Sequence, residues 1–139
     1  MFPDNATAPL EKNLELNVLA VAVANLADGP AGQEAAQPTI DDLFNTFVAA
    51  FTSAKDHNVG TLNTGSIGTG VFANSTTVVY VMQKLAAMHV GINLRYYGVD
   101  KKTPQKDLDA TVNKVVDAYT KSQTHTVKHL LELAHDILK

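Results

Sequence analysis

The sequence predicts an α/β fold, in which a parallel or mixed sheet is flanked by helices and followed by a helical C-terminal tail. Strand-like and helix-like patterns alternate from residue 14 to residue 99, in the order strand-helix-strand-helix-strand. Such alternation favours a parallel sheet joined by right-handed crossovers. Two amphipathic patterns then fill the end of the chain. At 139 residues, the chain has the size of one domain with a real core.

The first strand and the first helix follow a lead-in, residues 1–13, in which Pro3 and Pro9 oppose regular structure. Residues 14–26 are rich in Val, Leu and Ala without strict alternation, as in a strand buried on both faces. Residues 39–55 form an amphipathic pattern with Thr39 or Asp41 as its expected cap. Its apolar residues recur at helical spacing: Leu43, Phe44, Phe47, Val48 and Phe51.

The second half of the alternation contains a short strand, a long helix and a further strand. The strand covers residues 59–64, and the helix covers residues 75–90, which are apolar nearly all round and should be well buried. Gly91 is a natural C-terminal stop for this helix. Residues 92–99 read as the next strand. We therefore expect residues 14–100 to form the α/β unit.

The tail, residues 101–139, has a different pattern. Pro104 lies near the start of a helix whose apolar stripe runs from Leu108 to Tyr119. Residues 124–138 carry a second apolar stripe. Residues 121–124 either separate two helices or belong to one continuous helix. The stripes are docking faces against the sheet or, alternatively, a surface for a partner.

Composition excludes several classes of function. The net charge is −3 and basic residues are scattered, so bulk charge does not favour nucleic-acid binding. There is no cysteine, which excludes disulfides, cysteine nucleophiles and thiolate zinc sites. No stretch approaches the roughly 20 apolar residues of a membrane span, and residues 1–13 do not resemble a secretory signal. We expect a soluble, cytoplasmic protein without a resident cofactor or metal.

The most informative segment is residues 64–74, TGSIGTGVFAN, between the predicted strand and the long helix. Three glycines within six residues permit positive φ and close backbone approach. Successive N–H groups in such a turn bind anions, and the helix that follows adds its positive N-terminus. The glycines are Gly65, Gly68 and Gly70, and the side chains that can add hydroxyl or amide donors are Ser66, Thr69, Asn74, Ser75 and Thr76.

Spacing excludes two common nucleotide-binding motifs. The last glycine of this segment, Gly70, is not directly followed by Lys and then Ser or Thr, so the Walker pattern is absent. The glycines are spaced GxxGxG instead of GxGxxG, and the dinucleotide-binding acid about twenty residues on is missing. A tight turn that binds nothing is the alternative.

Residues 64–100 resemble the second half of the macrodomain-like catalytic domain of poly(ADP-ribose) glycohydrolases. Glycines 65, 68 and 70 match in register, together with Thr64 and Phe72, and residues 83–87, QKLAA, match the helix. The chain departs from the family at four positions: Ser66 replaces Asn, Ile67 replaces Trp, Thr69 replaces Cys and Ala73 replaces Gly. Residues 14–26 also look like a macrodomain strand, so the resemblance covers residues 14–100 as a partial macrodomain-like half-domain.

The resemblance implies that the loop holds the diphosphate and distal ribose of ADP-ribose, with Phe72 beside the ribose. Asp28, just past the first predicted strand, is a further ligand candidate. The implied ligand-binding set is Thr64, Gly65, Ser66, Gly68, Thr69, Gly70, Val71, Phe72, Asn74 and Asp28.

The catalytic acid of that family has no clear counterpart. The family carries glycines followed by paired glutamates, whereas Gln33-Glu34 follows the wrong strand and is a poor substitute. The chain therefore reads as the ADP-ribose-binding part of an ADP-ribosyl or poly(ADP-ribose) glycohydrolase, completed by a missing N-terminal half or a companion chain. The ligand would be ADP-ribose or an ADP-ribosylated protein. The alternative is a non-catalytic nucleotide- or protein-binding module that assembles with a partner chain.

Other chemistry-bearing residues have simpler explanations. Asp41 and Asp42 suit the positive end of a helix, although a carboxylate pair can bind metal. His125 and His129 share a helix face only if that helix is continuous, and they lack the HExxH glutamate. Arg95, Tyr96 and Tyr97 either pack in the sheet or contact a nucleotide.

Overall fold

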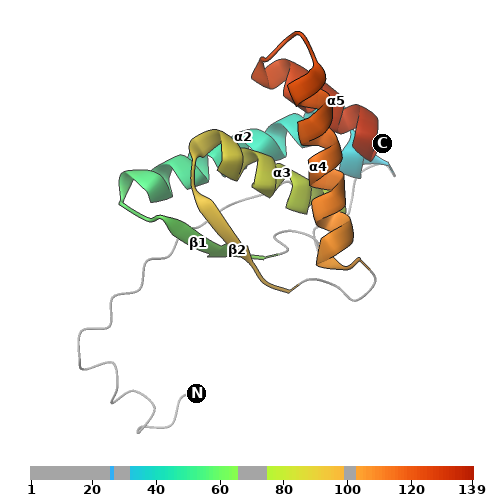
Figure 1. Cartoon of the computed structure of the whole chain (residues 1–139). Helices are drawn as coiled ribbons and strands as arrows, with labels where there is room; N and C mark the ends of the chain where they lie inside the picture. The colour runs from blue at the N-terminus through green and yellow to red at the C-terminus, as the bar shows by residue number, and fades with distance from the viewer. Residues whose placement is uncertain (1–25, 27–31, 66–74, 99–102) are drawn as a thin grey trace, which may run out of the picture.

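A computed structural model describes residue 26 and residues 32–65, 75–98 and 103–139. This part of the chain is mostly helical, with one small parallel sheet (Figure 1). The mixed α/β class predicted from the sequence agrees with it. Residues 14–25 of the first predicted strand and the candidate Asp28 fall outside the described residues, as do residues 66–74 of the glycine-rich loop.

The first described helices are η2 (Gln33–Ala35) and α2 (Gln37–Asp56). Helix α2 begins two residues before the predicted start, with Ala36 as its N-cap and Pro38 in the first turn. The capping role expected for Thr39 or Asp41 is therefore wrong. Its apolar stripe points inward as predicted, since Leu43, Phe44, Phe47 and Phe51 are buried.

A β-α-β unit follows. Strand β1 (Thr61–Thr64) leads through α3 (Thr76–Val90) to β2 (Asn93–Tyr96), and the two strands pair in parallel. Both strands are shorter than predicted, because residues 59, 60, 92, 97 and 98 lie outside the ladder. Leu62 pairs with Leu94 and Thr64 pairs with Tyr96 in this register.

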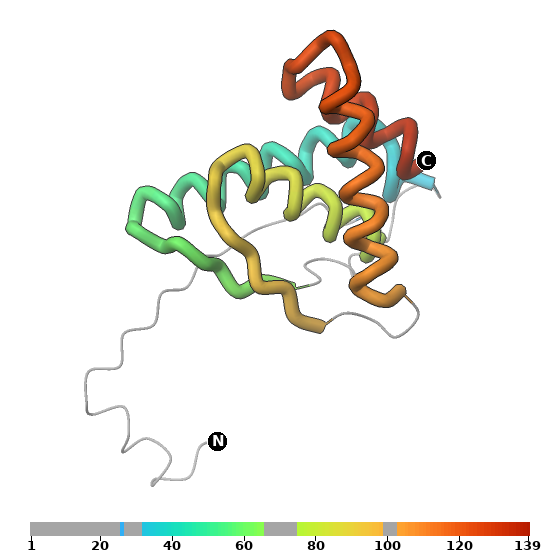
Figure 2. The backbone as a smooth tube through the Cα atoms, viewed as in Figure 1, coloured from blue at the N-terminus to red at the C-terminus, as the bar shows by residue number. Residues whose placement is uncertain are grey.

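Helix α3 is the centre of the molecule. Val78, Val79, Val81, Met82 and Leu85 are buried in one hydrophobic cluster with the apolar face of α2. Both helices lie on the same side of the sheet and run side by side (Figures 1 and 2). The expected burial holds for most of α3, although Met88 near its end is 59% exposed.

The predicted tail is two helices, α4 (Gln105–Lys121) and α5 (Val127–Leu138), separated at residues 122–126. Helix α4 packs on α3, and α5 packs on both α4 and α2. Leu108, Val112 and Val115 of α4, and Leu131 and Ala134 of α5, are buried in the same core as α2 and α3. The tail is therefore continuous with the α/β unit. The C-terminal end of α5 lies beside η2 (Figure 1).

Candidate ligand-binding site

The glycine-rich loop connects the carboxyl end of β1 to the N-terminus of α3. In open parallel sheets, this end of the strands is where ligands bind. Of the residues assigned to the site, Thr64 and Gly65 are described; the remaining ones, Ser66, Gly68, Thr69, Gly70, Val71, Phe72, Asn74 and Asp28, lie outside the described residues.

The start of the loop is fixed by a buried glutamine on α3. Gln83 has an exposed fraction of 0%. The Thr64 hydroxyl donates to Gln83 Oε1 at 2.7 Å, and Gln83 Nε2 donates to the Gly65 carbonyl at 2.8 Å. Both ends of the buried amide are thus used in holding the chain where it leaves the sheet.

Gly65 also lies close to the neighbouring strand. The Tyr97 N–H donates to the Thr64 carbonyl at 2.9 Å. A Cβ atom at position 65 would come 3.2 Å from the Tyr97 carbonyl oxygen, closer than ordinary van der Waals contact. A glycine at position 65 therefore lets this segment and the segment at Tyr97 approach each other closely.

The end of the loop is fixed by a helix cap. Ser75 is the N-cap of α3, and its hydroxyl accepts a hydrogen bond from the Val78 N–H. Two further N–H groups of the first turn, at Thr76 and Thr77, have no intrahelical acceptor, as in any helix start. Together with the helix dipole, they favour an anion near this end of α3.

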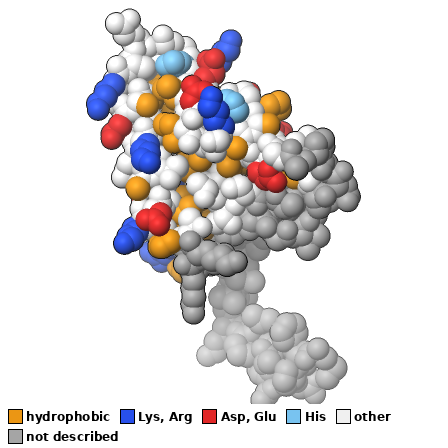
Figure 3. All heavy atoms as spheres, turned by 90° about the vertical axis from the view of Figure 1, so that its right-hand side faces the viewer, with side chains coloured by type: hydrophobic (Ala, Val, Ile, Leu, Met, Phe, Trp, Pro, Cys, Tyr) orange, Lys and Arg blue, Asp and Glu red, His pale blue; other side chains and the backbone are white. Residues whose placement is uncertain are grey.

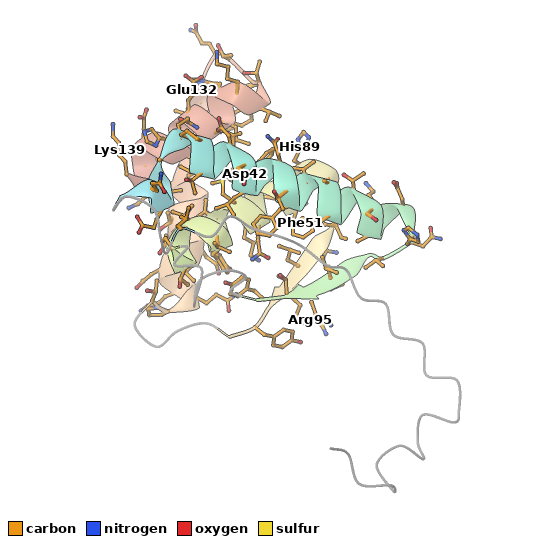
Figure 4. All side chains as sticks on the ribbon, turned by 180° about the vertical axis from the view of Figure 1, so that it is seen from behind. Asp42, Phe51, His89, Arg95, Glu132 and Lys139 are labelled. Carbon is orange, nitrogen blue, oxygen red and sulfur yellow. The ribbon has the colours of Figure 1, made fainter. Side chains whose placement is uncertain are left out.

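Arg95, Tyr96 and Tyr97, which the sequence suggested as nucleotide contacts or sheet residues, differ in their burial. Tyr96 is buried and meets the Tyr80 ring edge-on, with the ring centroids 4.6 Å apart. Tyr97 is 55% exposed, and Arg95 projects from the sheet on the side away from α2 and α3 (Figure 4). Tyr96 is therefore a core residue, whereas Arg95, which pairs with Asn63, and Tyr97, which lies next to Gly65, are exposed.

A cavity of about 710 Å³ begins where the loop ends. Three elements line it: η2 with the residues around it, the first turn of α3, and the last turn of α5. Its polar lining residues are Glu34, Ser75, Thr77, His135 and Lys139. Ser75 was expected from the sequence as a donor at the end of the loop. Glu34 was dismissed, and Thr77 and His135 were not selected, because only the packing of α5 brings these segments together.

A histidine links two walls of this cavity. His135 Nδ1 lies 2.8 Å from the Ala35 carbonyl oxygen. A carbonyl oxygen can only accept a hydrogen bond, so Nδ1 carries the hydrogen. Nε2 is then the ring nitrogen that remains to meet another group.

The remaining candidates have structural roles. Asp41 lies in the second turn of α2 and accepts a hydrogen bond from the Gln37 amide at 2.8 Å. His125 precedes α5, so it does not share a helix face with His129; its ring packs on Tyr119. Among the described residues, no group of three or more His, Asp or Glu is arranged to hold a metal ion.

Surface charge on the described residues agrees with the scattered basic residues of the sequence. On the face that contains α4, positive and negative side chains are interspersed (Figure 3). No described helix combines the length and the hydropathy that crossing a bilayer requires.

Comparison with known proteins adds no assignment. No protein-family model matches the chain, and no curated protein matches its sequence significantly.

Proposed function

We propose that the chain is the ADP-ribose-binding part of a macrodomain-like ADP-ribosyl or poly(ADP-ribose) glycohydrolase, with loop 64–74 holding the diphosphate and ribose. One observation carries the proposal: the loop joins the carboxyl end of a parallel strand to the N-terminus of a helix. Backbone amides and a helix dipole meet an anion at this junction. Because the net charge is −3 and the lysines are scattered, these amides are the natural hydrogen-bond donors to a phosphate.

The anchors on both sides of the loop support this proposal. Gln83 fixes the chain at Thr64 and Gly65, and Ser75 caps the helix at the other end. Binding is tighter when the binding groups are held in place before the ligand arrives, because less conformational entropy is lost. A segment anchored in this way suits a preorganised ligand loop.

Two exposed side chains beside the loop suit a nucleotide. Tyr97 offers an aromatic ring for stacking on a base, and Arg95 offers a guanidinium that pairs well with phosphate. Arg95 belongs to β2, and Tyr97 directly follows the last residue of that strand. The adenosine monophosphate half of ADP-ribose carries both a base and a phosphate.

The glycohydrolase step requires a general acid, which we assign to a glutamate of an N-terminal half or of a companion chain. Free ADP-ribose, its polymer and an ADP-ribosylated protein all present the same diphosphate to the loop. The binding part and the catalytic part of the proposal therefore need separate measurements.

Isothermal titration calorimetry with ADP-ribose tests the binding part. The wild-type chain is compared with Gly70→Val, which introduces a β-branched side chain into the loop. The proposal expects the variant to bind at least about tenfold more weakly, a loss of about 1.4 kcal/mol. Gly60→Ala is the matched control, since a Cβ at position 60 meets nothing within 4 Å. Equal binding by wild type and Gly70→Val would contradict the assignment of the loop.

The second candidate is a non-catalytic nucleotide- or protein-binding module that assembles with a partner chain. One observation favours it: among the described residues, the parallel sheet has only two strands. Parallel sheets are usually covered on both faces and contain more strands. A sharp size-exclusion peak at monomer mass, without affinity for any companion chain, would count against this candidate.

A further inference from the structure

The cavity between η2, α3 and α5 has the size and lining of a small-molecule site. Its volume of about 710 Å³ lies within the range of roughly 300–1,000 Å³ that ligand pockets occupy. Val78 and Leu138 supply apolar surface, and polar side chains from three separate elements converge on it. The segments that meet here are about one hundred residues apart in the sequence, as the hydrogen bond from His135 to Ala35 shows.

The polar groups of the cavity are divided between donors and acceptors. Thr77, in the first turn of α3, lies in one wall, and Lys139 also lines the cavity, with its ammonium group 3.5 Å from the Asp136 carboxylate. The wall at Thr77 suits a phosphate, because its hydroxyl can donate a hydrogen bond and the helix dipole favours negative charge. Glu34 lies in the η2 wall, where a carboxylate would repel a second anion and accept hydrogen bonds from hydroxyl groups instead.

His135 is oriented for contact with a ligand. The Ala35 carbonyl holds the hydrogen on Nδ1, which fixes both the ring orientation and the tautomer of the neutral imidazole. Neutral His135 therefore presents Nε2 as an acceptor for a hydroxyl group. The half-buried position of this side chain leaves it partly accessible.

We propose that this cavity binds a small phosphorylated sugar, with the phosphate against the first turn of α3 and the sugar hydroxyls against Glu34 and His135. The inference goes beyond the proposed function, because it holds whether or not loop 64–74 binds ADP-ribose. It assigns to the C-terminal helix α5 a direct role in ligand binding.

Nuclear magnetic resonance of the histidine rings, in a buffer without phosphate, tests the inference. The probes are ribose 5-phosphate, inorganic phosphate and ribose, each titrated into the full chain. We expect ribose 5-phosphate to shift the His135 Nε2 signal saturably and to bind roughly tenfold more tightly than inorganic phosphate. His129, on the same helix but outside the cavity lining, is the internal control.

Two isosteric variants separate the two walls. Thr77→Val removes a hydroxyl from the phosphate wall and should weaken both phosphate compounds several-fold, whereas Thr111→Val on α4 should not. Glu34→Gln removes the negative charge, so inorganic phosphate should bind at least as tightly while the preference for ribose 5-phosphate falls.

The outcomes distinguish this inference from the proposed function. Absence of a saturable His135 shift with ribose 5-phosphate overturns the cavity assignment, even if calorimetry detects ADP-ribose binding that depends on Gly70. An unchanged preference for ribose 5-phosphate in Glu34→Gln overturns the placement of the sugar hydroxyls. A saturable His135 shift that weakens in Thr77→Val supports the inference, including the case in which ADP-ribose does not bind.

Discussion

Gln83 shows how one buried polar side chain connects the core to the candidate site. It lies within an apolar helix, and yet both of its amide atoms are hydrogen-bonded to the segment that begins the loop. Buried polar groups are costly when they lack a partner, so this pairing fixes Thr64 and Gly65 relative to α3. Gln83 is therefore a positioning residue for the end of strand β1, where the glycine-rich segment begins.

Replacement of Gln83 by Leu should destabilise the fold by about 2–4 kcal/mol, because two hydrogen bonds are lost and the Gly65 carbonyl is left without its donor. The measurement is the free energy of unfolding from urea denaturation. Gln123→Leu is the matched control, since Gln123 is exposed in the connection between α4 and α5. A loss below about 0.5 kcal/mol for Gln83→Leu, the range of ordinary surface changes, would contradict this role.

Tyr80 has a related role between α3 and α4. Its hydroxyl is buried and donates to the Asp109 carboxylate, while the Gln105 amide donates to the same hydroxyl at 3.4 Å. Burial raises the pKa of Tyr80 well above its ordinary value of 10.0, and the hydrogen bond and negative charge of Asp109 raise it further. The phenol therefore stays protonated when the chain is folded.

A raised folded-state pKa predicts the pH dependence of stability. Below pH 10 the phenol is protonated in both the folded and the unfolded chain, so the contribution of this linkage is fully present there. Above pH 10 the unfolded chain loses this proton first, so the stability should fall as the pH rises through the folded pKa. Denaturation at pH 8 to 11 should show a smaller fall for Tyr80→Phe than for wild type; an equal fall would contradict the coupling.

At the scale of elements, helix ends were predictable where the responsible residues are local. Gly91 ends α3 as predicted, and its φ of 86° places it in the left-handed region that favours glycine. The start of α2 was misplaced because Ala36 and Pro38 lack the polar side chain that marks a cap in sequence. The strands were predicted too long, since apolar patterns continue beyond the residues that pair.

A pair of glycine variants tests this distinction. Gly91→Ala should destabilise the protein by about 1 kcal/mol, because Ala is strained at positive φ and its Cβ would lie 3.1 Å from Lys55 Nζ. Gly60→Ala should be neutral or stabilising by up to about 1 kcal/mol, since position 60 is open and has no positive φ. Thermal unfolding followed by circular dichroism measures both, and equal losses would contradict the argument.

At the scale of the whole molecule, sequence periodicity gave the fold class and the helical nature of the tail, but it did not show where the tail packs. The stripe that contains Leu131 and Ala134 indicates a buried face without naming its neighbour. Its packing on α2 and α4, and the His135 hydrogen bond to Ala35, depend on contacts between residues far apart in sequence. The cavity was unpredictable for the same reason, whereas the prediction of a ligand loop at residues 64–74 depends on local glycine spacing alone and stays a prediction.

Shared packing predicts that α2, α3, α4 and α5 unfold as one cooperative unit. Leu131→Ala removes a buried side chain of α5 that belongs to the same cluster as the apolar faces of α2 and α3, and should cost about 2–4 kcal/mol. In native-state hydrogen exchange, amides in the middle of α3 should lose protection by a similar free energy as those of α5, because both open in the same global transition. Val127→Ala, at an exposed position at the start of α5, is the control and should leave α3 unchanged. If Leu131→Ala lowered protection in α5 and left α3 as in wild type, the tail would be a separately unfolding unit, and the cavity that α5 completes would open without unfolding the sheet.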